Sequence, residues 1–171
     1  MTYNIHPILV HFPIALLVVY SGIKLLPLQR WFPSVSWKHI ERALLFFGIL
    51  GAFASLSTGE TAEYLTRPQQ DIVQAHALFA NTATWMYGLI LIGEIVLLAT
   101  PWVAARAPSL HIPKVVTFFR DLLTHPILSK TLAVLGLVTI SITGLLGGVM
   151  VYGTSADPAA AIVLRILGIT Y

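Results

Sequence analysis

Apolar residues dominate four long stretches of this sequence, and short polar connections separate them. The stretches cover residues 7–27, 39–58, 76–100 and 126–152. Each has about the 20 residues that an α-helix needs to cross the hydrocarbon core of a bilayer. We therefore predict an all-α integral membrane protein. Its four helices should run up and down as one bundle, so that residues 1–171 form a single transmembrane domain.

Two shorter apolar segments have the pattern of helices that lie at a membrane surface. In the connection 101–125, apolar residues recur at helical spacing, which predicts a short amphipathic helix. These residues are Val115, Val116, Phe118, Phe119, Leu122 and Leu123. The apolar segment 159–167 is too short to span a bilayer. It predicts a C-terminal interfacial helix or a strip that contacts a partner.

The composition supports a membrane protein and removes several kinds of chemistry. Of the residues, 57% are hydrophobic and 10% are charged, whereas a soluble domain has about 25% charged residues. The cysteine count of 0 excludes disulfides, thiolate zinc sites, iron–sulfur clusters and cysteine nucleophiles. The net charge of +3 does not indicate nucleic-acid binding, because the basic residues lie at helix ends rather than on one soluble face.

The basic residues are divided unequally between the two sides of the predicted bundle. Only Arg67 and Arg165 fall on the side of the termini. The other side has Lys24, Arg30, Lys38, Arg42, Arg106, Lys114, Arg120 and Lys130. By the positive-inside rule, both termini and the acidic connection 59–75 should lie on the outer side. Residues 1–6 have no positive segment and no cleavage site, so the segment from Pro7 is expected to be an uncleaved membrane helix.

Histidines and carboxylates gather at the predicted outer boundary, where a polar group in a membrane helix usually has a function. The chain opens with His6-Pro7-Ile8-Leu9-Val10-His11-Phe12-Pro13. The candidates at this depth are His6, His11, Glu60, Glu63 and His76. The remaining histidines, His39, His111 and His125, fall on the inner side and are not expected to join them.

One chemistry that this pattern favours is haem b, which needs two axial imidazoles facing each other across a bundle. The first and third helices of an up-and-down bundle are diagonally opposite, so His11 and His76 are the predicted ligands. Arg67 is a predicted partner of a haem propionate. Small residues on the other two helices would leave room for the macrocycle; they are Gly51, Ala52, Ser55, Gly144, Gly147 and Gly148.

The alternative chemistry is a bare ion, because histidine and carboxylate together suit zinc, iron, manganese or copper. Glu60 and Glu63 are three residues apart and share a face if the second helix extends that far. With the three outer histidines they would form a mixed site. His6 and His11 are separated by roughly 140° on a regular helix. They would therefore join one ion only if His6 lies outside the helix.

Each candidate also has a purely structural interpretation. His6 and His76 suit interfacial helix starts, and His11 suits a hydrogen bond to a carbonyl freed by Pro13. The two glutamates suit a solvated loop. Gly144 and Gly148 form a GxxxG pattern, which is typical of helix packing. Glu94 should lie on the inner side, because it is about 27 Å from His76 along a straight helix, and we expect it to pair with Lys24 or Lys130.

The opening signature, His-Pro-x-x-Val-His-Phe-Pro from His6 to Pro13, resembles that of a bacterial membrane family catalogued as domain of unknown function 2231. Looser matches are Thr58-Gly59, His76 and the segment from Thr143 to Gly153. The resemblance covers most of the chain and implies a four-helix domain in a bacterial inner membrane. Relatives often have a histidine near the end of the fourth helix, where this chain has Leu145, Leu146 and Thr154. Some relatives are joined to electron-transfer domains, which implies a redox setting.

Two functional hypotheses are favoured over a third, which is a transporter or a membrane enzyme. The first is a membrane protein with an outer-side haem b or metal site that serves electron transfer. Such a protein would be a subunit of a larger membrane complex. The second is an accessory subunit without a cofactor, which packs into a larger complex through its small-residue faces. We expect no enzymatic activity of the chain's own, because it has neither a Ser-His-Asp order nor an HExxH motif. Transport is disfavoured by four helices without a detectable inverted repeat.

Overall fold

A computed structural model describes residues 3–107 and 112–170, and in that part of the chain every regular element is a helix. The four longest are α1 (His6–Leu25), α3 (Trp37–Thr66), α4 (Gln70–Arg106) and α6 (Pro126–Tyr152). Each is long and apolar enough to cross a membrane. Four shorter elements complete the described chain: α2 (Leu28–Trp31), α5 (Lys114–Thr124), η1 (Gly153–Ala156) and α7 (Ala160–Ile166). The prediction of an all-α, four-helix membrane fold is confirmed.

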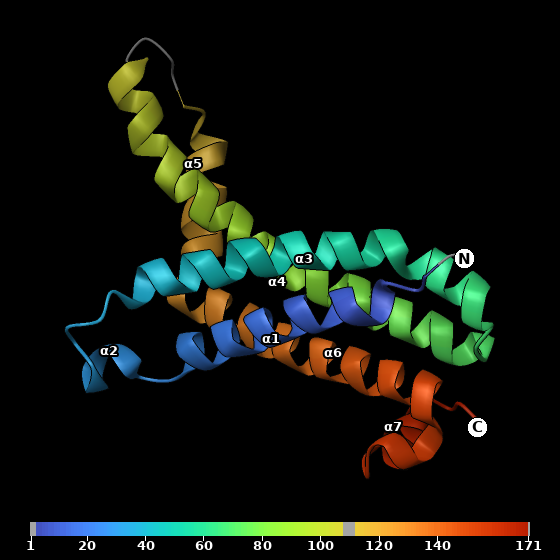
Figure 1. Ribbon diagram of the computed structural model, residues 1–171. Coiled ribbons are helices and arrows are strands. Elements are labelled where there is room, and N and C mark those ends of the chain that lie inside the picture. The colour runs from blue at the N-terminus through green and yellow to red at the C-terminus, as the bar shows by residue number, and fades with distance from the viewer. Residues whose placement is uncertain (1–2, 108–111, 171) are drawn as a thin grey trace.

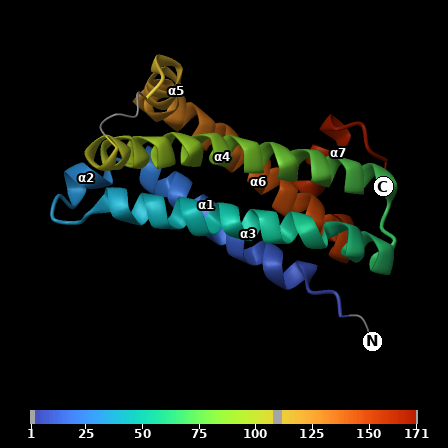
Figure 2. The same cartoon turned by 90° about the horizontal axis from the view of Figure 1, so that it is seen from above.

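The long helices lie side by side in an up-and-down bundle (Figures 1 and 2). Helix α1 packs mainly on α3 and α4 mainly on α6, while the pairs α1–α6 and α3–α4 close the square. Helices α1 and α4 are therefore diagonally opposite. The end with the two termini and the α3–α4 turn is called the histidine end below. The opposite end, with α2 and α5, is called the cationic end.

The connection between α3 and α4 is much shorter than the sequence indicated. Helix α3 continues to Thr66 and α4 begins at Gln70, so the expected acidic loop 59–75 is helical except for residues 67–69. Charged residues end an apolar run, but glutamate and alanine still favour helix. Helix α3 ends at Arg67, which has the left-handed φ of 47°.

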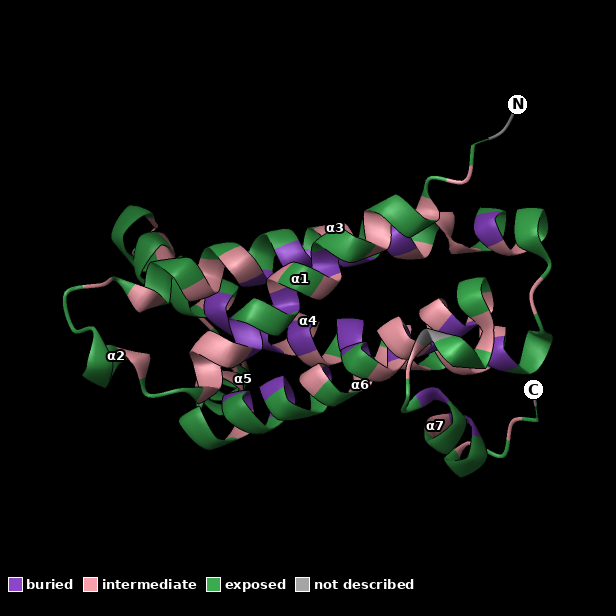
Figure 3. Cartoon of the chain, turned by 60° about the horizontal axis from the view of Figure 1, so that its bottom comes forward, coloured by how far each residue is buried: buried purple, intermediate pink, exposed green. Residues whose placement is uncertain are grey.

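The two short helices expected at the membrane surface are present. Helix α5 is amphipathic and has no buried residue, and Figure 3 shows it green and pink. Helix α7 differs, because its Ala160 and Leu164 are buried against Ile72, Leu146 and Val149. The C-terminal segment therefore covers the bundle at the histidine end.

Small residues allow the long helices to approach closely. A Cβ atom placed on Gly136 would lie 2.7 Å from the ring of Tyr87, and one on Gly48 would lie 2.6 Å from Leu17. Both distances are shorter than a van der Waals contact. The apolar core around them includes Tyr20, Leu45 and other residues of all four long helices. In lipid, close packing of this kind replaces the hydrophobic effect as the force that holds helices together.

Charged side chains join α1, α3 and α4 at the cationic end. Arg42 Nε donates to Glu94 Oε2 at 2.9 Å, and Lys24 Nζ lies 3.3 Å from Glu41 Oε2. Lys38 Nζ lies 3.8 Å from the Glu41 carboxylate and 3.9 Å from that of Glu94. The most buried members of this network are Lys24, Glu41 and Glu94, with side chains 10%, 14% and 10% exposed.

Glu94 thus lies at the expected end of the bundle but has a different partner from the expected Lys24 or Lys130. Its hydrogen-bond partner is Arg42 of α3. Lys24 instead reaches Glu41, which projects from α3 toward α1. Sequence separation along one helix indicates depth, but it does not indicate which neighbouring helix supplies the counter-charge.

We predict that Gly136→Ala destabilises the protein by about 1–3 kcal/mol, because the added methyl group would overlap the buried Tyr87 ring. Reversible unfolding in mixed detergent and SDS micelles would measure the loss. Gly88→Ala is the matched control, since a Cβ atom there would have no neighbour within 4 Å. Equal stability of the two variants would contradict the close approach of α4 and α6.

We also predict that Arg42→Met costs about 1–3 kcal/mol, because it removes the charged hydrogen bond of the largely buried Glu94. In the same unfolding assay, adding Glu94→Gln to this variant should restore part of the loss, since the uncompensated charge is then gone. Strictly additive losses would show that the two side chains do not interact.

Candidate functional site

His6 is the first residue of α1 and is fixed by a side chain of α3. Its Nδ1 atom lies 2.9 Å from Thr58 Oγ1. The single hydroxyl hydrogen of Thr58 is directed at the Ser55 carbonyl oxygen, 2.9 Å away. With the Thr58 hydrogen on the Ser55 carbonyl, His6 Nδ1 carries a hydrogen and donates it to Thr58 Oγ1. In the neutral ring this leaves Nε2 with a free lone pair.

His76 is fixed in an equivalent way by α6. It lies two turns inside α4, rather than at the helix start that the sequence indicated. Its Nδ1 atom lies 3.0 Å from the carbonyl oxygen of Thr143. A carbonyl only accepts hydrogen bonds, so Nδ1 carries the hydrogen and Nε2 is again free. Gly147 adjoins the ring, since a Cβ atom there would lie 3.4 Å from His76 Cε1.

The two imidazoles come from diagonally opposite helices to one depth at the histidine end. Both side chains are partly buried. Each ring presents an unprotonated Nε2, which is the form that binds a metal. This pair is the strongest candidate site in the described part of the chain.

His11 does not take part in this pair. Its side chain is exposed on α1, and its Nδ1 atom hydrogen-bonds the Pro7 carbonyl oxygen within the same helix. Because His6 belongs to the helix, the two residues are about 140° apart around it, and only His6 is turned toward α3. The structure turns His6 into the bundle and leaves His11 exposed, while the pairing of His11 with His76 as ligands stays a prediction. Helix α1 also continues unbroken through Pro13, which is buried.

The predicted acidic ligands lie on the last turns of α3. Glu60, Glu63 and Arg67 line a shallow surface hollow together with Gln70. The Glu63 carboxylate accepts a hydrogen bond of 3.0 Å from Gln70 Nε2. Among residues 3–107 and 112–170, no three His, Asp or Glu side chains are grouped so as to hold a metal ion. The mixed five-residue metal site and the role of Arg67 toward a propionate both stay predictions.

The glycines expected to leave room for a macrocycle serve helix packing in this structure. A Cβ atom on Gly51 would lie 3.0 Å from Phe12, and one on Gly144 would lie 3.8 Å from Ile14. Both positions therefore face side chains of α1. Gly148 is partly buried on α6. Gly147, one residue before it, is the glycine that adjoins a candidate ligand.

Two partners of the histidines were not identified from the sequence. The Thr58 hydroxyl is one, and a signal for it existed, because a hydroxyl in an apolar helix needs a partner. The Thr143 carbonyl is the other. A backbone oxygen has no signature in a sequence, so only the structure could identify it. Of the inner histidines, His39 and His125 lie at the cationic end, whereas His111 lies outside the described residues.

Comparison with known proteins identifies a family. Residues 2–157 match the family model described as "Predicted membrane protein (DUF2231)", and the chain therefore belongs to that family of membrane proteins. None of the curated proteins and none of the solved structures gives a significant match.

We predict that His6 and His76 are both neutral Nδ1–H tautomers at neutral pH, because each Nδ1 donates to an oxygen. Nitrogen-15 NMR of histidine-labelled protein would distinguish this tautomer from the Nε2–H form. Thr58→Val should shift the His6 signals toward the Nε2–H tautomer and leave those of His76 unchanged. Unchanged His6 signals in this variant would show that Thr58 does not orient the ring.

Proposed function

We propose that this membrane protein holds a transition-metal centre between the Nε2 atoms of His6 and His76, either the iron of haem b or a bare ion, and that the centre serves electron transfer. The observation that carries the proposal is the matched state of the two rings. Each comes from one of two diagonally opposite helices, and each has its Nδ1–H committed to an oxygen atom.

Such hydrogen bonds are the usual outer partners of metal-bound histidines. A bond from the second ring nitrogen to an oxygen fixes the tautomer, orients the ring and makes Nε2 a better ligand. The Thr58 hydroxyl and the Thr143 carbonyl would have these roles here. A purely structural role would explain one such bond for each histidine. It would not require two histidines in the same state at the same end of the bundle.

Haem iron and a bare ion would both bind the two histidine Nε2 atoms. They differ in the other groups that each requires from the protein. Haem b is held by two imidazoles from facing helices, and Gly147 gives space beside the His76 ring. Arg67, in the α3–α4 turn at the same end, could pair with a propionate. A bare ion would need further ligands, and the carboxylates of Glu60 and Glu63 on the last turns of α3 have the right chemistry for that role.

The distribution of basic residues between the two ends of the bundle indicates on which side of the membrane this centre would lie. The cationic end has eight of the ten basic residues, which supports its placement on the cytoplasmic side. The histidine end and both termini would then face the periplasm of a bacterial inner membrane. A single metal centre needs an electron donor and an acceptor, so this function implies other membrane subunits as partners.

The alternative function is an accessory subunit without a cofactor, packed into a larger membrane complex. The packing of Gly51 and Gly144 against α1 favours it, because these small residues already have a structural use. In that case the bonds from His6 and His76 would only join helix ends.

We predict that the purified protein shows a haem b spectrum, with a sharpened α-band after reduction by dithionite, or else about one bound transition-metal ion per chain. His6→Ala and His76→Ala should each abolish the signal. His11→Ala is the matched control and should retain it, because that exposed side chain is turned away from the pair. Elemental analysis of the same samples separates haem iron from a bare ion.

A featureless spectrum together with no stoichiometric metal, in protein purified without chelator, would overturn the metal centre and favour the accessory subunit. Loss of the signal in His11→Ala with retention in His6→Ala would restore the pairing of His11 with His76. Circular dichroism of each variant ensures that a lost signal does not reflect a lost fold.

A further inference from the structure

Helix α4 is too long to lie wholly within a bilayer. Its 37 residues span about 55 Å, whereas the hydrocarbon core is about 30 Å thick. Figure 1 shows that its last turns and α5 leave the other long helices together at the cationic end. This pair of segments, called the α4–α5 projection below, packs on itself, and Leu123 of α5 lies against Gly93 of α4 at its base.

Helix α5 has an exposed apolar face and a second face that packs toward α4. At about 100° per residue, Val115, Phe118, Phe119 and Leu122 fall on one face about 100° wide. All four are exposed, and Phe118 is 62% exposed. The partly buried side chains of Val116, Arg120 and Leu123 fall on the face toward α4. The apolar face therefore has no partner among the described residues of this chain.

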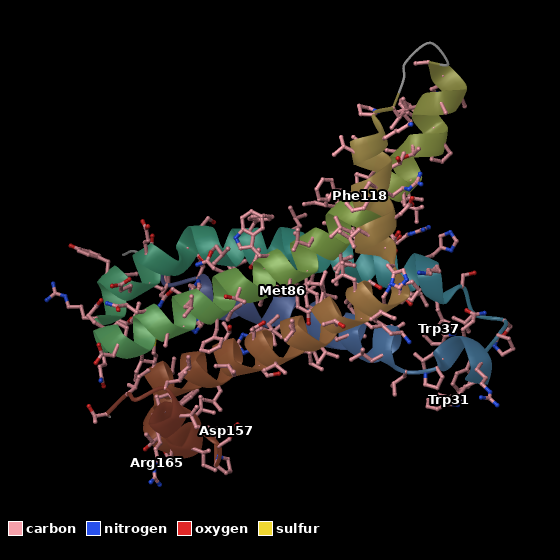
Figure 4. The ribbon with its side chains drawn as sticks, turned by 180° about the vertical axis from the view of Figure 1, so that it is seen from behind. Trp31, Trp37, Met86, Phe118, Asp157 and Arg165 are labelled. Carbon is pink, nitrogen blue, oxygen red and sulfur yellow. The ribbon has the colours of Figure 1, made fainter. Side chains whose placement is uncertain are left out.

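The direction of this face indicates what covers it. In Figure 4, Phe118 lies on the side of the projection that faces back along the length of the bundle. That is the side on which a bilayer surrounding the four long helices must lie. Trp31 and Trp37, which mark the same end in Figure 4, are typical of the boundary between lipid and water. Trp102, 57% exposed, adds a third tryptophan on the projection itself.

The charges of the projection are complementary to anionic headgroups. Residues 101–125 include three basic residues and a single acid, Asp121. Its carboxylate is bound by Arg120 at 2.7 Å. Arg106 and Lys114 are exposed, and no carboxylate pairs with either among the described residues. The Arg106 guanidinium is held 4.5 Å above the Trp102 ring, an arrangement that places a fixed positive charge beside an interfacial aromatic ring.

We propose that the α4–α5 projection is a binding surface for anionic phospholipids. Its apolar face enters the boundary of the acyl chains, and Arg106 and Lys114 contact headgroup phosphates. A helix of 11 residues gains little from apolar burial alone, so a charge contribution from the lipid would determine which lipids surround it. This inference is independent of the proposed metal centre at the opposite end of the bundle.

The test uses the full chain, whose lack of cysteine permits single labelled sites. Phe118→Cys, labelled with a fluorophore in phosphatidylcholine vesicles, should be quenched strongly by lipids that have a nitroxide near the headgroup. Thr117→Cys is the matched control on the same helix, because residue 117 is partly buried and lies about 150° from the centre of the apolar face. It should be quenched much less.

Headgroup preference is measured with the same Phe118→Cys protein. Nitroxide-labelled phosphatidylglycerol should quench roughly twofold or more efficiently than nitroxide-labelled phosphatidylcholine. The preference should disappear when Arg106→Gln and Lys114→Gln are added, and it should persist with Arg165→Gln, which removes a charge from the histidine end.

Two outcomes would overturn the proposal. Equal quenching at positions 117 and 118 would mean that the apolar face is in water or is covered by a second copy of the chain. Equal quenching by the two headgroups would mean that the projection lies on the bilayer without selecting anionic lipid.

Discussion

The bundle depends on a hydrogen bond at its centre, between the side chains of Tyr87 and Ser21. The Ser21 hydroxyl is directed at the Ala133 carbonyl oxygen, 3.4 Å away, so Tyr87 donates to Ser21 Oγ at 2.7 Å. This contact joins α1, α4 and α6. Tyr87 also meets the ring of Tyr20 edge-on, with centroids 5.9 Å apart, and fills the space above Gly136. In lipid, close packing and interhelical hydrogen bonds hold helices together, so this contact helps to set how α4 is turned against α1 and α6.

This contact joins the diagonally opposite helices α1 and α4. It fixes the rotation of α4, and that rotation determines where His76 and Glu94 point at the two ends of the bundle. His76 is 11 residues from Tyr87 and Glu94 is 7 residues from it in the other direction, about 16 Å and 10 Å along α4. At about 100° per residue, His76 lies within roughly 20° of Tyr87 around α4, so the orientation fixed at the centre also turns His76 into the bundle, where it bonds the Thr143 carbonyl of α6. Likewise Glu94 must turn toward Arg42 on α3. The candidate site and the charge network are thus two consequences of one helix orientation.

The sequence predicted those features that depend on bilayer thickness. It identified four spans and two further short helices, and it placed His76 and Glu94 at opposite ends. It did not predict helix ends beyond the apolar runs, because leaving the bilayer does not stop a helix, and α3 ends only at the left-handed Arg67. It also did not show that His11 is exposed whereas His6 bonds a side chain of α3. Choosing between two histidines on one helix requires the helix's rotation, which periodicity in an all-round apolar segment does not give.

The choice between His6 and His11 has a physical logic that the structure makes plain. His11 lies well within the apolar signature, but its ring bonds a carbonyl of its own helix and faces outward. His6 lies at the helix start, before the apolar run begins, and the Thr58 hydroxyl of α3 is within hydrogen-bonding distance of it. In the proposed centre, a histidine at the end of one long helix and a histidine two turns inside its diagonal neighbour would meet near the boundary between lipid and water. A redox centre at that depth would be held by the membrane bundle and still be accessible to an electron-transfer partner outside it.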